Sequence, residues 1–327
     1  SQIARRNRFW LHRGAIRCSK LQDRNLGPSF TIQVIIADQP AITLNLTRVE
    51  NSLTNSLTSV WIVEQEKEGG KIKDIQDHAT MRAVGRFTLY RDYENEAAIV
   101  VFHDAHLIKG WVQNHRFENL VNNTNGSDDF NEIFVLKDEY LSSKFRELTG
   151  RIPYTTVVIQ LAQEDISKGK RDAVMTTIAN WNAVDMFYSK FDNAPVRINI
   201  IGILIPKDNQ SNPWVTSNIF QNETGNYLTP QSLIDLDASF PERFPRTFIV
   251  SYVPENVDIN ATHPARGSDK KTRVAIIRSD ESPSTIAYKF SLLPSRSTWD
   301  ENQECYDEEM NIHPRRSPSW LKVAQNE

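Results

Sequence analysis

The sequence predicts a mixed α/β protein in which a mostly β region precedes a region of alternating strands and helices. Short runs rich in β-branched and aromatic residues follow one another before Phe145. Beyond that residue, strand-like runs alternate with amphipathic helical segments, as in a sheet layered with helices. With 327 residues, of which 39% are hydrophobic, the chain is long enough for two ordinary domains, each with its own core.

The first region begins with a basic, irregular arm at residues 1–27, which we interpret as a solvated tail or packed extension. Domain boundaries are then expected at 28–150 and 151–327. The expected strands of the first region are 32–36, 42–46, 84–90, 97–102 and 107–120. His103 and His106 flank an expected turn, and no third ligand is evident that would make them a metal site.

The second region begins with an apolar run that is typical of a buried strand. A long amphipathic helix follows, and a later helix starts at Thr229, with Pro230 in its first turn. The expected strands are 155–161, 196–205, 246–253 and 273–277, and the first helix is expected at 172–190. A last helix is expected within residues 282–300.

Several function classes are disfavoured by composition and motifs. The net charge of −3 and pI near 6.2 leave no electrostatic footprint for nucleic acid. No apolar run approaches the roughly 18 residues of a membrane span. The G-x-S-x-G elbow of serine hydrolases and the phosphate-binding G-x-x-x-x-G-K-[ST] loop do not occur.

Cysteines and glycosylation sequons bear on the compartment. Cys18 and Cys305 are too few for a disulfide framework; they could form one long-range bridge or be unrelated thiols. N-x-[ST] sequons occur at Asn45, Asn122, Asn125, Asn209, Asn222 and Asn260. Because the sequons tend to fall in polar, loop-like stretches, we expect a secreted glycoprotein.

Several stretches of the sequence follow one another in the same order as segments of a known protease family, which has a prodomain before its protease domain. Residues 85–90, 97–101 and 107–112 look like the strands of its prodomain, and 196–203 and 273–277 like two strands of its protease domain. Met310 stands where its Met-turn would lie. This order resembles the reprolysin group of metzincin zinc proteases, which includes ADAM proteins, snake-venom metalloproteases and arthropod salivary enzymes. The resemblance implies a prodomain-like β domain followed by a metzincin-like domain with a twisted mixed sheet and long helices.

The zinc motif of that family, H-E-x-x-H-x-x-G-x-x-H, falls on residues that cannot perform its chemistry. The three ligand positions hold Tyr288, Leu292 and Thr298, and the glycine position holds Ser295. Lys289 occupies the general-base position, where an ammonium can neither take a proton nor approach Zn²⁺ favourably. The inhibitory cysteine and dibasic processing site expected of the family are also missing. We therefore expect no zinc and no other cofactor.

These observations predict a catalytically inactive metalloprotease homologue, a pseudoprotease that acts as a protein-binding or scaffold glycoprotein. A protein partner would dock in the former substrate cleft, against an edge strand expected within residues 257–266, or the chain would associate with itself. Two alternatives stay open. One is an active zinc endopeptidase with a non-standard site built from His263, His313 and acidic residues after position 300; the other is a structural protein of a secreted matrix.

Overall fold

The computed structural model describes residues 10–17, 27–36, 40–49, 53–65, 72–113, 115–120, 132–135, 154–189, 197–223, 225–239, 244, 247–259 and 274–291. The chain divides into two compact units. The first unit combines Ser1–Glu50 with Gly85–Phe145, and the second combines Asn51–Val84 with Arg146–Glu327.

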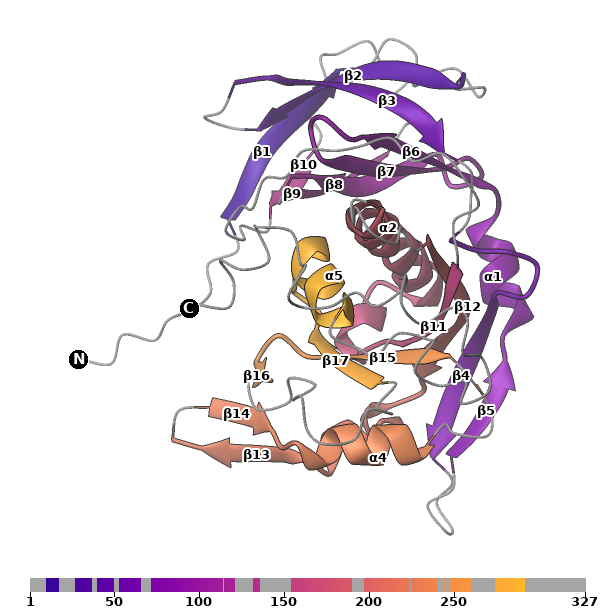
Figure 1. Cartoon of the computed structure of the whole chain (residues 1–327), viewed down its shortest axis with the longest axis vertical. Helices are drawn as coiled ribbons and strands as arrows, with labels where there is room; N and C mark the ends of the chain where they lie inside the picture. Colours follow the sequence, from indigo (N-terminus) through magenta and orange to yellow (C-terminus); the bar gives the residue numbers. More distant parts are fainter. Residues whose placement is uncertain are drawn as a thin grey trace, which may run out of the picture. The chain divides into compact units, whose positions relative to one another are not determined.

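An antiparallel sheet forms the first unit (Figure 1). Its described strands are β1 (Trp10–Arg17), β2 (Ser29–Ile36), β3 (Ile42–Val49), β6 (Phe87–Asp92), β7 (Ala97–Phe102), β8 (Leu107–Val112), β9 (His115–Leu120) and β10 (Glu132–Val135). They follow the order β10-β1-β2-β3-β6-β7-β8-β9. Because β9 and β10 at the two ends of this order lie next to each other, the sheet curls into a half-barrel.

Alternation of apolar and polar residues builds the core of this sheet. Phe30, Ile32 and Val34 on β2 are buried, while the residues between them are exposed. The ring of Phe30 meets that of Tyr90 edge to face, with 4.7 Å between centroids. These side chains pack in one cluster with others from β3, β7, β8 and β9.

Two hydrogen-bonded carboxylates, those of Asp92 and Asp104, position the hairpins of the first unit. Asp92 accepts the backbone N–H groups of Glu94 and Asn95 in its own turn and that of Asn45 on β3, the last at 2.7 Å. Gly85 has a φ of 72°, and a Cβ there would lie 2.2 Å from the Asp104 carboxylate, so only glycine fits. The same carboxylate accepts the N–H of Arg86 at 2.9 Å.

A mostly parallel sheet forms the second unit (Figure 1). Its described strands are β4 (Ser59–Gln65), β5 (Ile72–Gln76), β11 (Tyr154–Gln160), β12 (Arg197–Pro206), β15 (Phe248–Val253) and β17 (Val274–Arg278). The order is β17-β15-β11-β12-β4-β5, and only the β4–β5 pair is antiparallel. A second, small sheet has the order β13-β14-β16, with β13 at Ile219–Asn222, β14 at Gly225–Leu228 and β16 at Val257–Asp258.

Helix α2 (Lys170–Tyr188) connects the parallel neighbours β11 and β12. From Ala173 to its end, every residue except Thr176 is buried. The fully buried Asp185 accepts the Ile198 N–H at 2.7 Å and pairs with the Arg197 guanidinium at 2.9 Å, which ties the end of α2 to the start of β12. The other described helices are α1 (His78–Val84), α3 (Pro213–Thr216), α4 (Gln231–Ser239) and α5 (Pro283–Ser291), with short turns η1 (Glu164–Ile166) and η2 (Asn209–Ser211).

The mixed α/β class predicted from sequence is confirmed, but the course of the chain differs from the expected domain ranges. Residues 59–65 lie in a charged stretch for which no strand was expected, but they form β4. Because β4 pairs in parallel with β12, residues 51–84 belong to the second unit. Residues 10–17 of the expected basic arm form β1, paired with β2 and β10. The single strand expected at 107–120 is a hairpin that turns at Gln113, where φ is 53°. Among the described residues, no helix is long and apolar enough to cross a membrane.

Candidate functional site

Helix α5, which lies within the stretch compared above with the zinc motif, is positioned by the strand and turn before it. The last described strand, β17, is buried along Val274–Ile277 and leads into the turn that ends at Ser282. The Ser282 hydroxyl accepts the Thr285 N–H at 3.2 Å, as a helix cap does, and Pro283 takes the first helical position. Local sequence therefore determines where α5 begins.

The apolar face of α5 packs against aromatic side chains of the second unit. Phe290 is buried, and its ring centroid lies 5.8 Å from that of Trp181, 5.3 Å from that of Tyr188 and 5.2 Å from that of Phe248. All three pairs are steeply inclined, with interplanar angles of 87°, 74° and 72°. Such edge-to-face contacts add to the burial of apolar area. They hold α5 against α2 and β15.

Lys289 lies on the same helix as part of a buried ion pair. Its Nζ lies 2.5 Å from Oε1 of Glu281, and the two side chains are 11% and 7% exposed. The same Glu281 oxygen accepts the Arg278 N–H at 3.2 Å. Burial raises the pKa of Glu281 above its ordinary value, against the lowering effect of Lys289. The ammonium at the expected general-base position thus donates to a carboxylate of the preceding turn.

The remaining positions of the motif are less fully described. Tyr288 lies in α5, but its side chain is outside the described residues. Outside them as well are Leu292, Ser295, Thr298, Met310, Cys18, Cys305, His263 and His313. Among the described residues, no group of three or more His, Cys, Asp or Glu side chains is placed to hold a metal ion.

Two sequon asparagines have described side chains, and both are exposed. Asn45 lies on β3, where its side-chain oxygen accepts the Thr31 hydroxyl at 3.2 Å. Asn222 ends β13, and its side-chain oxygen accepts the Gly225 N–H at 3.0 Å. Asn209 lies in η2, but its side chain is not described. The sequons at Asn122, Asn125 and Asn260 fall outside the described residues.

The edge strand expected within residues 257–266 is described only at its start. Val257–Asp258 forms β16, which pairs in parallel with β14 in the small sheet and ends the order of that sheet. The stretch from Asn260 lies outside the described residues.

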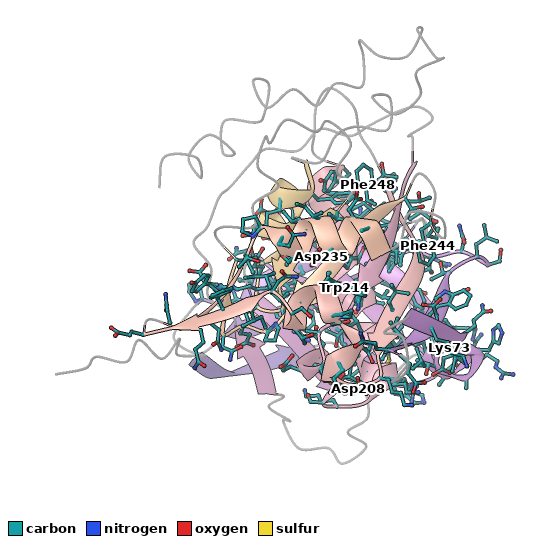
Figure 2. The ribbon with its side chains drawn as sticks, turned by 90° about the horizontal axis from the view of Figure 1, so that it is seen from below. Lys73, Asp208, Trp214, Asp235, Phe244 and Phe248 are labelled. Carbon is teal, nitrogen blue, oxygen red and sulfur yellow. The ribbon has the colours of Figure 1, made fainter. Side chains whose placement is uncertain are left out.

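A buried polar network that the sequence analysis did not identify lies where the chain changes direction across the large sheet. The chain leaves β12 on one side of β11 and returns as β15 on the other, a switch point where α/β sheets often bind ligands. Here Gln160 and Ser251 are paired neighbours, and neither is exposed. Gln160 donates to the Asn212 side chain, and the Trp214 indole N–H donates to the Ser251 hydroxyl at 3.4 Å. Figure 2 labels Trp214, together with Asp235 of helix α4, which is not a member of this network. Because all four members are buried, the network holds α3 to the sheet and leaves no open site.

One open depression lies elsewhere in the second unit, with a volume of about 380 Å³. It is lined by Thr58, Ser59, Val60, Gln76, Asp77, His78, Met81 and Arg82. Asp77 is already used there: it accepts the Thr80 N–H at 3.0 Å and pairs with Lys170 at 3.1 Å. The lining therefore lacks a free pair of groups for acid–base chemistry.

No protein-family model matches the chain, and a comparison with curated proteins finds no similar protein.

Proposed function

We propose that the chain is a secreted, catalytically inactive relative of reprolysin-type zinc proteases that works as a protein-binding or scaffold glycoprotein. The observation that carries the proposal is the ion pair of Lys289 with Glu281, both nearly buried, at 2.5 Å. A general base must present a lone pair to the metal-bound water. An ammonium held by a buried carboxylate cannot do this.

The surroundings of α5 support the same function. The helix is capped by Ser282, anchored by Phe290 among three aromatic rings and tied by Lys289 to the turn before it. Each contact stabilises the helix in its place. A fold that keeps this helix without catalytic groups would still offer backbone edges for recognition, which needs no metal.

A charge-swapped variant tests the proposal. Lys289→Glu combined with Glu281→Lys places a carboxylate at the general-base position and preserves the ion pair, so the helix should stay folded. We expect neither this variant nor the wild-type chain to cleave casein in the presence of zinc, because no ligand set surrounds the carboxylate. Zinc-dependent cleavage, abolished by a chelator, in either protein would overturn the proposal.

A further inference from the structure

The edge strands of the two sheets in the second unit differ in how they are protected against pairing with another chain. The outer strand β17 is buried along Val274–Ile277. The opposite outer strand, β5, carries Lys73 and Asp74, and charge is a common protection of exposed edges. In the small sheet, β13 has the sequence Ile-Phe-Gln-Asn and carries no charge. Among the described residues, no strand pairs with its outer side.

The backbone of β13 has hydrogen-bonding groups directed to that outer side. The Thr229 N–H donates to the Asn218 carbonyl at 3.1 Å, immediately before the strand. Antiparallel pairs alternate between bonded and non-bonded positions, so Phe220 bonds to Tyr227, while Ile219 and Gln221 direct their N–H and C=O groups away from β14. These groups are the template that strand addition requires.

An exposed aromatic side chain marks the same strand. Phe220 is 58% exposed, and its ring stacks on that of its cross-strand partner Tyr227 at 5.9 Å and 28°. Figure 1 shows β13 beside β14, with β13 on the outer side of the pair. Aromatic side chains are enriched in the cores of protein interfaces, so an exposed ring on an unpaired edge gives a partner an apolar contact.

Charge around the small sheet indicates the kind of partner. Every charged side chain that the structure describes between positions 208 and 259 is acidic: Asp208, Glu223, Asp235, Asp237, Glu255 and Asp258. Arg243 and Arg246 lie outside the described residues. Two of these carboxylates lie next to β13 and form the acidic rim: Glu223 is in the β13–β14 turn, and Asp235 accepts the side-chain N–H of Asn218, just before the strand, at 2.8 Å. Glu255 and Asp258 belong to β16 and the turn before it, on the other side of β14. An acidic rim repels a second copy of the same edge and attracts a basic segment.

We infer that the outer edge of β13 binds an extended peptide segment of apolar and basic residues, which adds to the small sheet as a further strand. Its backbone pairs with Ile219 and Gln221, an apolar side chain covers Phe220, and its basic side chains lie near the acidic rim. This inference rests on the edge itself and is independent of the pseudoprotease proposal.

Fluorescence anisotropy with a labelled peptide of alternating valine and lysine tests the inference. We expect binding that weakens with added salt. Gln221→Pro removes an outward N–H without touching the β13–β14 ladder, and it should weaken binding by about tenfold or more. Asp74→Pro is the matched control, because the Asp77 N–H bond to the Val60 carbonyl places Asp74 at the equivalent outward position of β5. It should leave the affinity unchanged.

Two further arms separate strand addition from mere charge attraction. A valine–lysine peptide with a methyl group on every backbone nitrogen has the same charge and side chains but no N–H group to donate to the edge, so we expect it not to bind. Phe220→Gln keeps the backbone and the charge of the edge but removes the exposed ring, so it should also weaken the valine–lysine peptide by about tenfold. Equal binding of the two peptides, or full affinity in a folded Gln221→Pro or Phe220→Gln variant, would overturn the inference.

Discussion

Two ion pairs of the second unit have the same chemistry and the same separation but different surroundings. In both Lys289–Glu281 and Lys207–Glu64 the ammonium nitrogen lies 2.5 Å from a carboxylate oxygen. The side chains of the first pair are 11% and 7% exposed, and those of the second are 53% and 33% exposed. Judged by this distance alone, the two ion pairs would be expected to contribute equally to stability. Their burial gives them different roles.

Burial changes the electrostatics of each pair. Loss of water around Glu281 raises the pKa of that carboxyl, even with Lys289 beside it. At the surface, the hydrogen bond to Glu64 is the largest influence on Lys207 and raises the pKa of its ammonium group. A buried charge that loses its partner has no water to replace it, whereas a surface charge does. Variants of each lysine should therefore behave differently.

The largest effect is expected from Lys289→Met, which leaves the Glu281 carboxylate buried without its ammonium partner. The free energy of unfolding should fall by about 3–5 kcal/mol, the usual cost of breaking a buried ion pair from one side. Urea unfolding followed by the fluorescence of the buried tryptophans measures it. A loss near zero would mean that the pair does not hold α5 in place.

A smaller loss is expected when both members of the pair become apolar. Lys289→Met combined with Glu281→Leu removes the uncompensated charge, so the double variant should regain most of the stability lost by Lys289→Met. The same unfolding experiment gives the coupling between the two positions. Additive losses would show that the two side chains act independently, against the structure described here.

The pH dependence of stability isolates the contribution of Glu281. Because its pKa is raised in the folded state above the ordinary 4.5, the folded chain holds this proton more tightly than the unfolded chain. The contribution of Glu281 to the free energy of unfolding therefore decreases as pH rises from about the ordinary value through the raised one. Glu281→Gln should remove that decrease, seen as a difference between the two stability–pH curves in this interval. Parallel curves would contradict the raised pKa.

The smallest effect is expected at the surface pair. Lys207→Met should leave the unfolding midpoint unchanged within the error of the measurement, because water replaces the lost partner of Glu64. A destabilisation as large as that of Lys289→Met would remove the contrast between the two pairs.

Local patterns predicted much of this fold, while long-range pairing was less accessible. The helix expected at 172–190 is α2, and its apolar spacing was a sufficient signal. The strand β4 was missed because its neighbours in the sequence are charged, whereas its partner β12 lies more than a hundred residues away. Periodicity reports how a segment is buried and does not identify its partner.

The candidate site was also predicted only in part. The position of Lys289 in a helix followed from the motif, but its pairing with Glu281 depends on the turn between β17 and α5. The network of Gln160, Ser251 and Trp214 was only weakly indicated by the sequence, in which Gln160 and Ser251 are polar residues within otherwise apolar strands. Such residues indicate a buried partner without identifying it.

The most direct test of the proposal that the chain has lost a zinc site is the metal content of the purified native chain, measured by mass spectrometry after dialysis against buffer with trace zinc. The account predicts far less than one zinc per chain, because Tyr288, Lys289 and Leu292 do not supply the usual zinc ligands. One tightly held zinc per chain would contradict it, and His263 and His313 would then be the first residues to replace.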